Sequence, residues 1–277
     1  MKSLSYYTPE QHKEHVAFDG SDYGILSSIW LSQALWGLGY PEQALHQCQS
    51  GVDLANGYGH PASQAMALAY QSLLYQLCQE PDAVQRCAER CLSLAKQHTI
   101  GYYQEWAAIF YTWSLAYPDP TAEKIAALRA ALDDFRAIGG GLRWSYYLAL
   151  LAGLYERAGD IESGLDMIAQ AFTVAERTGE AWWNAELYRL RGELLSRQCA
   201  DPDQVEAVYQ QAIDLARAQG ALALELRATA SLARLWQSQG ETAQAYTLLA
   251  GVYAQFTEGF ETPDLQAAQT LLATLTT

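Results

Sequence analysis

The sequence has no long hydrophobic run and few of the residues that favour β-strands. No stretch approaches the roughly 20 apolar residues that span a bilayer, and the amino terminus, MKSLSYYTPEQHKEH, lacks the apolar core of a signal peptide. Val, Ile and Thr are sparse beside Ala, Leu, Gln and Glu, and no segment sustains a polar–apolar alternation. These absences argue against a membrane protein and a β-sheet fold. We therefore expect a cytoplasmic, all-α protein.

Positive charge is also scarce. The 277 residues include 17 Lys and Arg against 31 Asp and Glu, which gives a formal net charge of −14. A surface of this charge repels the phosphate backbone of nucleic acids and the headgroups of anionic membranes. We therefore expect neither as a partner.

Cysteine and histidine are few, and their spacing leaves two interpretations open at two places. Cys87 and Cys91 lie four residues apart on one predicted helix face, so they could share a metal, but zinc normally takes four ligands. His12 and His15 could likewise bind a metal or lie in a solvated turn. We favour packed thiols and a solvated segment, and we expect no metal and no cofactor.

The eight prolines divide the sequence, and none falls inside a long run of helical periodicity. Proline is poorly tolerated inside a helix but is well tolerated at its first position. The predicted starts of alternate helices recur at steps of 40, 39, 40, 42 and 39 residues, with Pro41, Pro81, Pro120, Asp160, Pro202 and Glu241 as markers. A near-constant step of this kind is typical of a helical repeat array.

The resulting map has six helix pairs. The first helix of each pair is predicted at 21–37, 62–78, 101–116, 142–158, 180–198 and 221–238. The second is predicted at 41–56, 81–97, 120–138, 160–177, 202–219 and 241–256. An N-terminal lead occupies 1–20, the repeats fill 21–258, and a capping segment at 259–277 completes one continuous domain. Its helix, at 263–275, should have Thr262 as N-cap, Pro263 at the first position and Asp264 near its positive end.

The stretches LAGLYERAGD (151–160) and LARLWQSQGE (232–241) align without gaps and resemble the tetratricopeptide repeat. In that scheme a small residue allows close helix approach, an aromatic residue fills the space between repeats, and a glycine and an acidic residue form the turn. The expected fold is a right-handed α-solenoid of about six tetratricopeptide-like pairs. The first helices should line a concave groove, which is the expected binding surface.

Aromatic residues are concentrated on the predicted first helices, and several occur as consecutive pairs. Neighbours on a helix point about 100° apart, so one member of Tyr146–Tyr147 and of Trp182–Trp183 should reach the groove or the edge of a repeat. Arginines on the same helices could bind a ligand, or could pair within the helix, as Glu186 with Arg189. We favour pairing there. The candidate ligand-binding or partner-binding patch of the groove is Arg143, Tyr146, Trp183, Arg189 and Arg227.

The sequence contains one glycine run of a kind that can bind phosphate. Gly139–Gly140–Gly141 precedes a predicted helix, as in a phosphate cradle, but no strand leads into it and no Lys-Ser/Thr follows. We therefore interpret it as a turn between repeats. The P-loop pattern G-x-x-x-x-G-K-[ST] is absent from the sequence.

The segments AELYRLRGELL (185–195) and ELRATASLARLWQSQGETAQAYTLLAGVYAQFTEGFETPDLQAAQTLL (225–272) resemble the C-terminal repeat region of large bacterial signalling ATPases. The segments at 7–24 and 34–45 are also similar to the start of that region. Those proteins carry a cyclase or DNA-binding domain, then an AAA or STAND-type nucleotide-binding domain, then tetratricopeptide-like repeats. The resemblance implies a sensor or scaffold segment, and a similar repeat region in the maltose-operon activator binds its sugar inducer.

Two function classes remain open, and neither is catalytic. The first is the regulatory segment of a bacterial signalling ATPase or cyclase, which would bind a protein segment or a small molecule in its groove. It would report occupancy to a nucleotide-binding or cyclase domain of the same or a partner chain. The second is a stand-alone scaffold for protein–protein assembly. An enzyme is not expected, because the sequence shows no catalytic residue set.

Overall fold

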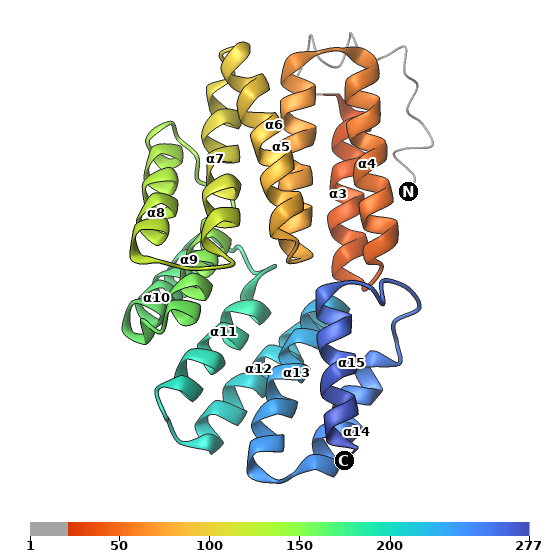
Figure 1. Cartoon of the computed structure of the whole chain (residues 1–277), viewed down its shortest axis with the longest axis vertical. Coiled ribbons are helices and arrows are strands. Elements are labelled where there is room, and N and C mark those ends of the chain that lie inside the picture. Colours follow the sequence, from red (N-terminus) through yellow and green to blue (C-terminus); the bar gives the residue numbers. More distant parts are fainter. Residues whose placement is uncertain (1–21, 277) are drawn as a thin grey trace. The chain divides into compact units, whose positions relative to one another are not determined.

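The computed structural model describes residues 22–276, and this range contains thirteen α-helices and no strand. This confirms the predicted fold class, which is an α-solenoid built from helix pairs and followed by a C-terminal helix (Figure 1). Most of the predicted N-terminal lead, including His12 and His15, lies outside the described residues. None of the helices described is both long and apolar enough to cross a bilayer.

Each pair consists of two helices joined by a short connection. The first helices are α3 (Tyr23–Gly37), α5 (Pro61–Leu77), α7 (Gly101–Ala116), α9 (Trp144–Ala158), α11 (Asn184–Arg197) and α13 (Leu222–Gln239). The second helices are α4 (Pro41–Tyr58), α6 (Pro81–Gln97), α8 (Ala122–Ala137), α10 (Ile161–Thr178), α12 (Pro202–Gln219) and α14 (Thr242–Tyr253). The last helix is α15 (Pro263–Leu275).

Five of the six predicted markers lie at helix starts, and the sixth, Pro120, precedes α8 by two residues. Pro41, Pro81 and Pro202 occupy the first helical turn, where a missing N–H costs nothing. Asp160 is the N-cap of α10, and its carboxylate accepts a hydrogen bond from the N–H of Ser163 at 3.2 Å. Thr262 is the N-cap residue of α15, but its hydroxyl donates to the carbonyl of Gly259 instead of capping the helix.

Six predicted helix boundaries are wrong by more than one residue: the starts of α3, α8, α9 and α11 and the ends of α4 and α14. Helix α11 begins at Asn184, not at 180, because residues 181–183 form a turn. Trp182 therefore precedes the helix and Trp183 is its N-cap. Arg143, predicted on a helix, is the N-cap of α9 in a left-handed conformation with φ of +64°. Helix α14 ends at Tyr253, three residues short of the prediction.

The chain divides into two compact units. Unit 1 contains the described residues up to Trp36, Tyr40–Pro118 and Ala126–Gly140, and unit 2 contains Gly37–Gly39, Asp119–Ile125 and the described residues from Gly141 onward. In unit 1, α5 packs against α4, α6 and α7. In unit 2, α11 packs against α9, α10, α12 and α13, and α13 also packs against α12, α14 and α15. Within each unit, helices therefore pack against their neighbours in chain order, as the repeat pattern predicts.

Three of the first helices are buried on all sides. Residues 65–74 of α5, 145–152 of α9 and 223–233 of α13 are buried without interruption. Because eight consecutive residues cover more than two helical turns, no face of these segments is open. Tyr146 and Tyr147 are 0% and 1% exposed, so the prediction that one of this pair reaches a groove or a repeat edge is wrong.

The thiols of unit 1 are packed, as we favoured. Cys48, Cys87 and Cys91 are buried, and the Cys87 and Cys91 thiols donate to the Gln71 side-chain oxygen at 3.3 Å and the Ala65 carbonyl at 3.2 Å. Burial raises the pKa of Cys48 to about 12 and that of Cys87 to about 11. Both groups are therefore neutral at physiological pH.

The glycine run at 139–141 forms the turn between α8 and α9. Gly139 has φ of +90°, a conformation that L side chains rarely adopt. A side chain at Gly140 would meet the Phe135 ring, because its Cβ would lie 2.5 Å from the ring carbons. Chain geometry alone thus accounts for these two glycines.

Candidate functional site

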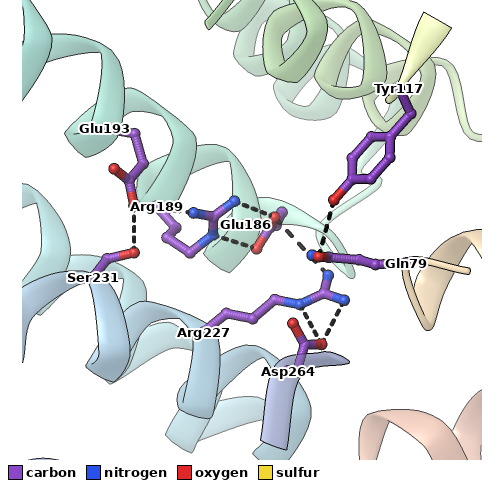
Figure 2. Close-up of polar contacts among 8 residues, drawn as sticks. All are labelled: Gln79, Tyr117, Glu186, Arg189, Glu193, Arg227, Ser231 and Asp264. Atoms are coloured by element: carbon purple, nitrogen blue, oxygen red, sulfur yellow. Dashed lines mark hydrogen bonds and ion pairs between the residues drawn. The ribbon is translucent and has the colours of Figure 1, made fainter. Parts of the chain in front are cut away.

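Unit 2 contains a charged network on its first helices. It joins α11, α13 and α15 through three carboxylates, two guanidinium groups and one hydroxyl (Figure 2). Its members are Glu186, Arg189, Glu193, Arg227, Ser231 and Asp264.

The first part of the charged network lies within α11. Arg189 donates two hydrogen bonds to Glu186, from Nε to Oε2 at 2.9 Å and from Nη2 to Oε1 at 2.7 Å. This two-pronged geometry is the strongest arrangement for a guanidinium–carboxylate pair. Arg189 Nη1 donates to Glu193 Oε1 at 3.2 Å, one turn further on. The helical pairing that the sequence favoured over ligand binding is present.

The second part joins α13 to α15. Arg227 donates from Nε and Nη2 to the same oxygen of Asp264, at 2.8 and 2.7 Å. Its third nitrogen, Nη1, lies 4.0 Å from Glu186 Oε1. Arg227 is only 8% exposed, so its charge depends on these carboxylates in place of water. The residue therefore connects the α11 pair to the last helix.

Ser231 forms a second polar contact between α11 and α13. Its hydroxyl donates to Glu193 Oε1 at 2.6 Å, the oxygen that also accepts from Arg189. Glu193 keeps a 27% exposed side chain and Arg189 a 15% exposed side chain. These two residues are the network's accessible edge on α11.

The charges in the network hold each other ionised. Burial raises the pKa of Glu186, but the charge and hydrogen bonds of Arg189 outweigh burial, with Arg227 adding to them, so the net shift is downward. Burial lowers the pKa of Arg227, but Asp264 and Glu186 outweigh it, so the net shift is upward. Glu186 and Arg227 are therefore charged at physiological pH.

An aromatic cluster lies between the start of α9 and the turn before α11. The Tyr146 ring is 5.2 Å from that of Trp183 and 5.5 Å from that of Trp182, and the two indoles are 4.8 Å apart. Tyr146 and Trp183 are buried, whereas Trp182 and Trp144 are partly exposed. The cluster therefore has a buried floor and a partly accessible edge.

Arg143 lies beside this cluster and is tied to the next repeat. Its backbone N–H donates to Glu180 Oε1 at 2.6 Å, and the Ser145 hydroxyl donates to Glu180 Oε2 at 3.0 Å. Glu180 therefore links the start of α9 to the next repeat from 37 residues away. This bond explains how a non-glycine residue is held at positive φ.

Side-chain bonds between repeats recur at a nearly fixed sequence separation. In unit 2, the separation is 37 residues for Arg227–Asp264 and Gln237–Thr274, and 38 for Ser231–Glu193 and Gln219–Ala181. In unit 1, Tyr117 donates to Gln79 at 3.1 Å, again 38 residues away. The sequence separation of these polar contacts is thus close to the spacing of about 40 residues between successive helix pairs.

The five residues of the sequence-predicted patch fall into two neighbouring sets. Arg143, Tyr146 and Trp183 belong to the aromatic region, and Arg189 and Arg227 belong to the charged network. Tyr146, Trp183 and Arg227 are buried, and Arg143 and Arg189 are half-buried. Sequence reasoning missed Asp264 and Glu180 as their partners, although the 37-residue separation is a signal that identifies both.

Within residues 22–276, no cluster of three or more His, Cys, Asp or Glu side chains could hold a metal ion.

No protein-family model matches the chain. An uncharacterized protein of Rhizobium meliloti (strain 1021) is 27% identical over 233 residues, which is 84% of this chain and 23% of the relative. The chain thus spans less than a quarter of the length of this relative.

Two solved structures share the helical architecture loosely. The first is a signal transduction ATPase with numerous domains (STAND) and a tetratricopeptide repeat sensor from Pyrococcus horikoshii. It is 13% identical with a TM-score of 0.49, over 96% of this chain and 40% of that one. The second is the TPR2AB domain of yeast Sti1 in complex with pHSP90. It is 13% identical with a TM-score of 0.38, over 91% and 98% of the two chains.

Proposed function

We propose that this chain is a non-catalytic recognition module that acts as the sensor segment of a longer signalling protein. The observation that carries the proposal is the chain of side-chain contacts across the first helices of unit 2. Tyr146 and Trp183 join α9 to the start of α11, and the charged network joins α11 to α13 and α15. In a repeat array each repeat contacts only its neighbours, so contacts of this kind are the route by which one repeat can affect the next.

The proposal follows from what buried charges do and do not contribute. A buried ion pair is seldom more stable than apolar side chains of the same size, so stability alone is a poor reason for five charged residues. We propose that these groups instead specify one arrangement of the helices that hold them. In a recognition module, a ligand that changes one helix would disturb the pairing of the next.

The recognised partner is a protein segment or a small molecule that contacts the accessible edge of this region. We assign Arg143 and Arg189 to polar contact, and Tyr146 and Trp183 to the aromatic floor beneath it. Arg227 fixes the position of α13 against α11 and α15. The longer protein is proposed from the Rhizobium meliloti relative, of which this chain matches 23%, and from the resemblance to the repeats of signalling ATPases and cyclases.

A binding screen on the purified chain tests this function. The probes are a library of 15-residue peptides and panels of sugars and nucleotides, with thermal shift and tryptophan fluorescence as readouts. Arg143→Asn is the test variant, because Asn tolerates the left-handed backbone at this position. Arg177→Ala, on the exposed end of α10, is the control.

We expect Arg143→Asn to weaken each confirmed ligand about tenfold, the effect of one charge-assisted hydrogen bond, and Arg177→Ala to leave affinity unchanged. The site assignment is contradicted if both variants bind every ligand like the parent chain.

A further inference from the structure

The last helix, α15, differs from all the others in how it is attached. Residues 254–262 separate it from α14, whereas every other connection between described helices has two to six residues (Figure 1). Phe256 is buried and fixes the first part of this connection. The remaining residues, 257–262, include Gly259 at φ of +78° and join α15 by a tether free of helix.

Helix α15 covers an apolar surface formed by α13 and α14. Its buried residues, Leu265, Ala268, Leu271 and Leu275, follow the three- and four-residue spacing of one helix face. They join a core that includes Ala228 and Leu232 of α13 and Leu249 and Val252 of α14. The opposite face of α15, with Gln266, Ala267, Gln269 and Thr270, is exposed.

A polar contact at each end fixes the register of α15 on this surface. At its start, the Asp264 carboxylate accepts both hydrogen bonds from Arg227. Near its end, Gln237 of α13 donates to the Thr274 hydroxyl at 3.0 Å. The first contact involves a buried charge, so any helix that sits here must bring a carboxylate to Arg227.

We propose that the α13–α14 surface beneath α15 is a helix-binding site, and that α15 is its reversible intramolecular occupant. The partner is an amphipathic helix with a carboxylate in its first turn. Its apolar residues lie one, four, seven and eleven positions after that carboxylate, as Leu265, Ala268, Leu271 and Leu275 do after Asp264. The non-helical tether lets α15 leave while α13 and α14 stay packed. This inference does not depend on the ligand assigned to the edge at Arg143.

Hydrogen exchange on the wild-type chain tests whether α15 opens by itself. Amides of α15 should exchange faster than those of α13, because the opening of one tethered helix costs less than global unfolding. Asp264→Asn should speed exchange in α15 about tenfold, because it weakens one charge-assisted contact. Exchange in α9 and α10 should not change. Equal rates in α15 and α13, in both proteins, would overturn the proposal.

A peptide in trans tests whether the uncovered surface binds a helix. The probe is fluorescein-labelled ETPDLQAAQTLLATLTT, residues 261–277 of this chain. The receptor is the full-length variant Leu265→Asp/Leu271→Asp, in which two charges disrupt the apolar face of α15. We expect the probe to bind this variant at least about tenfold more tightly than the wild-type chain, whose own α15 competes at high effective concentration.

Two altered peptides make the trans experiment specific. Asp264→Lys in the peptide places a cation against Arg227 and should weaken binding at least about tenfold. Gln266→Lys makes the same change on the exposed face and should have no effect. Equal binding of all three peptides, or no binding to a variant whose circular dichroism matches the wild type, would overturn the proposed site.

Discussion

Helices α5 and α13 occupy the same position in their repeats and are both buried on all sides, but their polar groups differ in kind. Helix α5 contains no charged residue, and its buried Gln71 donates to Gln49 at 2.9 Å and accepts from Cys87. Helix α13 buries Glu225 and Arg227, which pair with Arg217 and Asp264. The same repeat position is therefore filled by neutral hydrogen bonds in unit 1 and by ion pairs in unit 2.

This difference predicts how strongly a single substitution destabilises each unit. A neutral hydrogen bond contributes about 0.5–1.5 kcal/mol, and its loss can be relieved when the partner turns elsewhere. A buried ion pair that loses one partner leaves an uncompensated charge, at a cost of about 3–5 kcal/mol. We therefore expect unit 2 to respond sharply to single substitutions that unit 1 tolerates.

The largest effect should come from Arg227→Met. The change keeps much of the side-chain volume but leaves Asp264 without its cation, so we expect a loss of about 3–5 kcal/mol in the free energy of unfolding. Urea denaturation followed by circular dichroism measures it. The matched control, Arg227→Met/Asp264→Leu, removes both charges and should recover most of the loss. A loss below about 1 kcal/mol for the single variant would mean that the pair is effectively solvated.

The second largest loss of stability should come from a substitution at a closely packed glycine of unit 2. A Cβ at Gly192 of α11 would lie 2.4 Å from the Tyr209 ring of α12, whereas at Gly153 of α9 the nearest atom is 3.9 Å away. Gly192→Ala should therefore destabilise by about 1–3 kcal/mol through overpacking. Gly153→Ala should be neutral or stabilise by up to about 1 kcal/mol. Thermal unfolding of both variants checks the pair, and similar midpoints would contradict the close approach.

One buried group in each unit should contribute stability that depends on pH, Glu186 at the acid end of the range and Cys48 at the alkaline end. The lowered pKa of Glu186 contributes stability above the unfolded carboxyl value of about 4.3, and this is lost as pH falls through the folded pKa. The raised thiol pKa of Cys48, about 12, contributes stability below the unfolded value of about 8.5, lost as pH rises toward 12.

Each such group changes stability by at most about 1.4 kcal/mol per pH unit. Denaturation of Glu186→Gln and Cys48→Ala across the pH range should show flatter acid and alkaline limbs, respectively. Unchanged limbs in both variants would show that other groups govern the pH dependence.

The smallest effect is expected for Gln71→Leu. The substitution removes one donor to Gln49 and one acceptor for the Cys87 thiol, both neutral, so we expect a loss of about 1 kcal/mol. Urea denaturation under the conditions used for Arg227→Met gives the comparison directly. A loss as large as that of Arg227→Met would remove the distinction between the units.

The sequence predicts the helix pairs well because their boundaries are determined locally. Proline at Pro41, Pro81 and Pro202 and a capping carboxylate at Asp160 act within one helical turn. Boundaries fail where a distant residue intervenes. The start of α9, for example, depends on Glu180, which lies in the following repeat.

The candidate site is only half predictable from the sequence. The Glu186–Arg189 pair follows from helical spacing, whereas the Arg227–Asp264 pair depends on how one repeat lies against the next. Burial is also non-local, since Tyr146 is buried partly by Trp182 and Trp183, which lie in the following repeat. The separation of 37 or 38 residues in the contacts between repeats gives a rule by which such partners can be sought in sequence.

The central claim, that Arg227 couples α11 to α15, is tested most directly by a double-mutant cycle between Glu186→Gln and Asp264→Asn. These carboxylates lie on different helices, and each stays near Arg227 when the other is removed. The account predicts that the double variant loses about 1–3 kcal/mol more than the sum of the single losses. Additive losses, within about 0.5 kcal/mol, would contradict it.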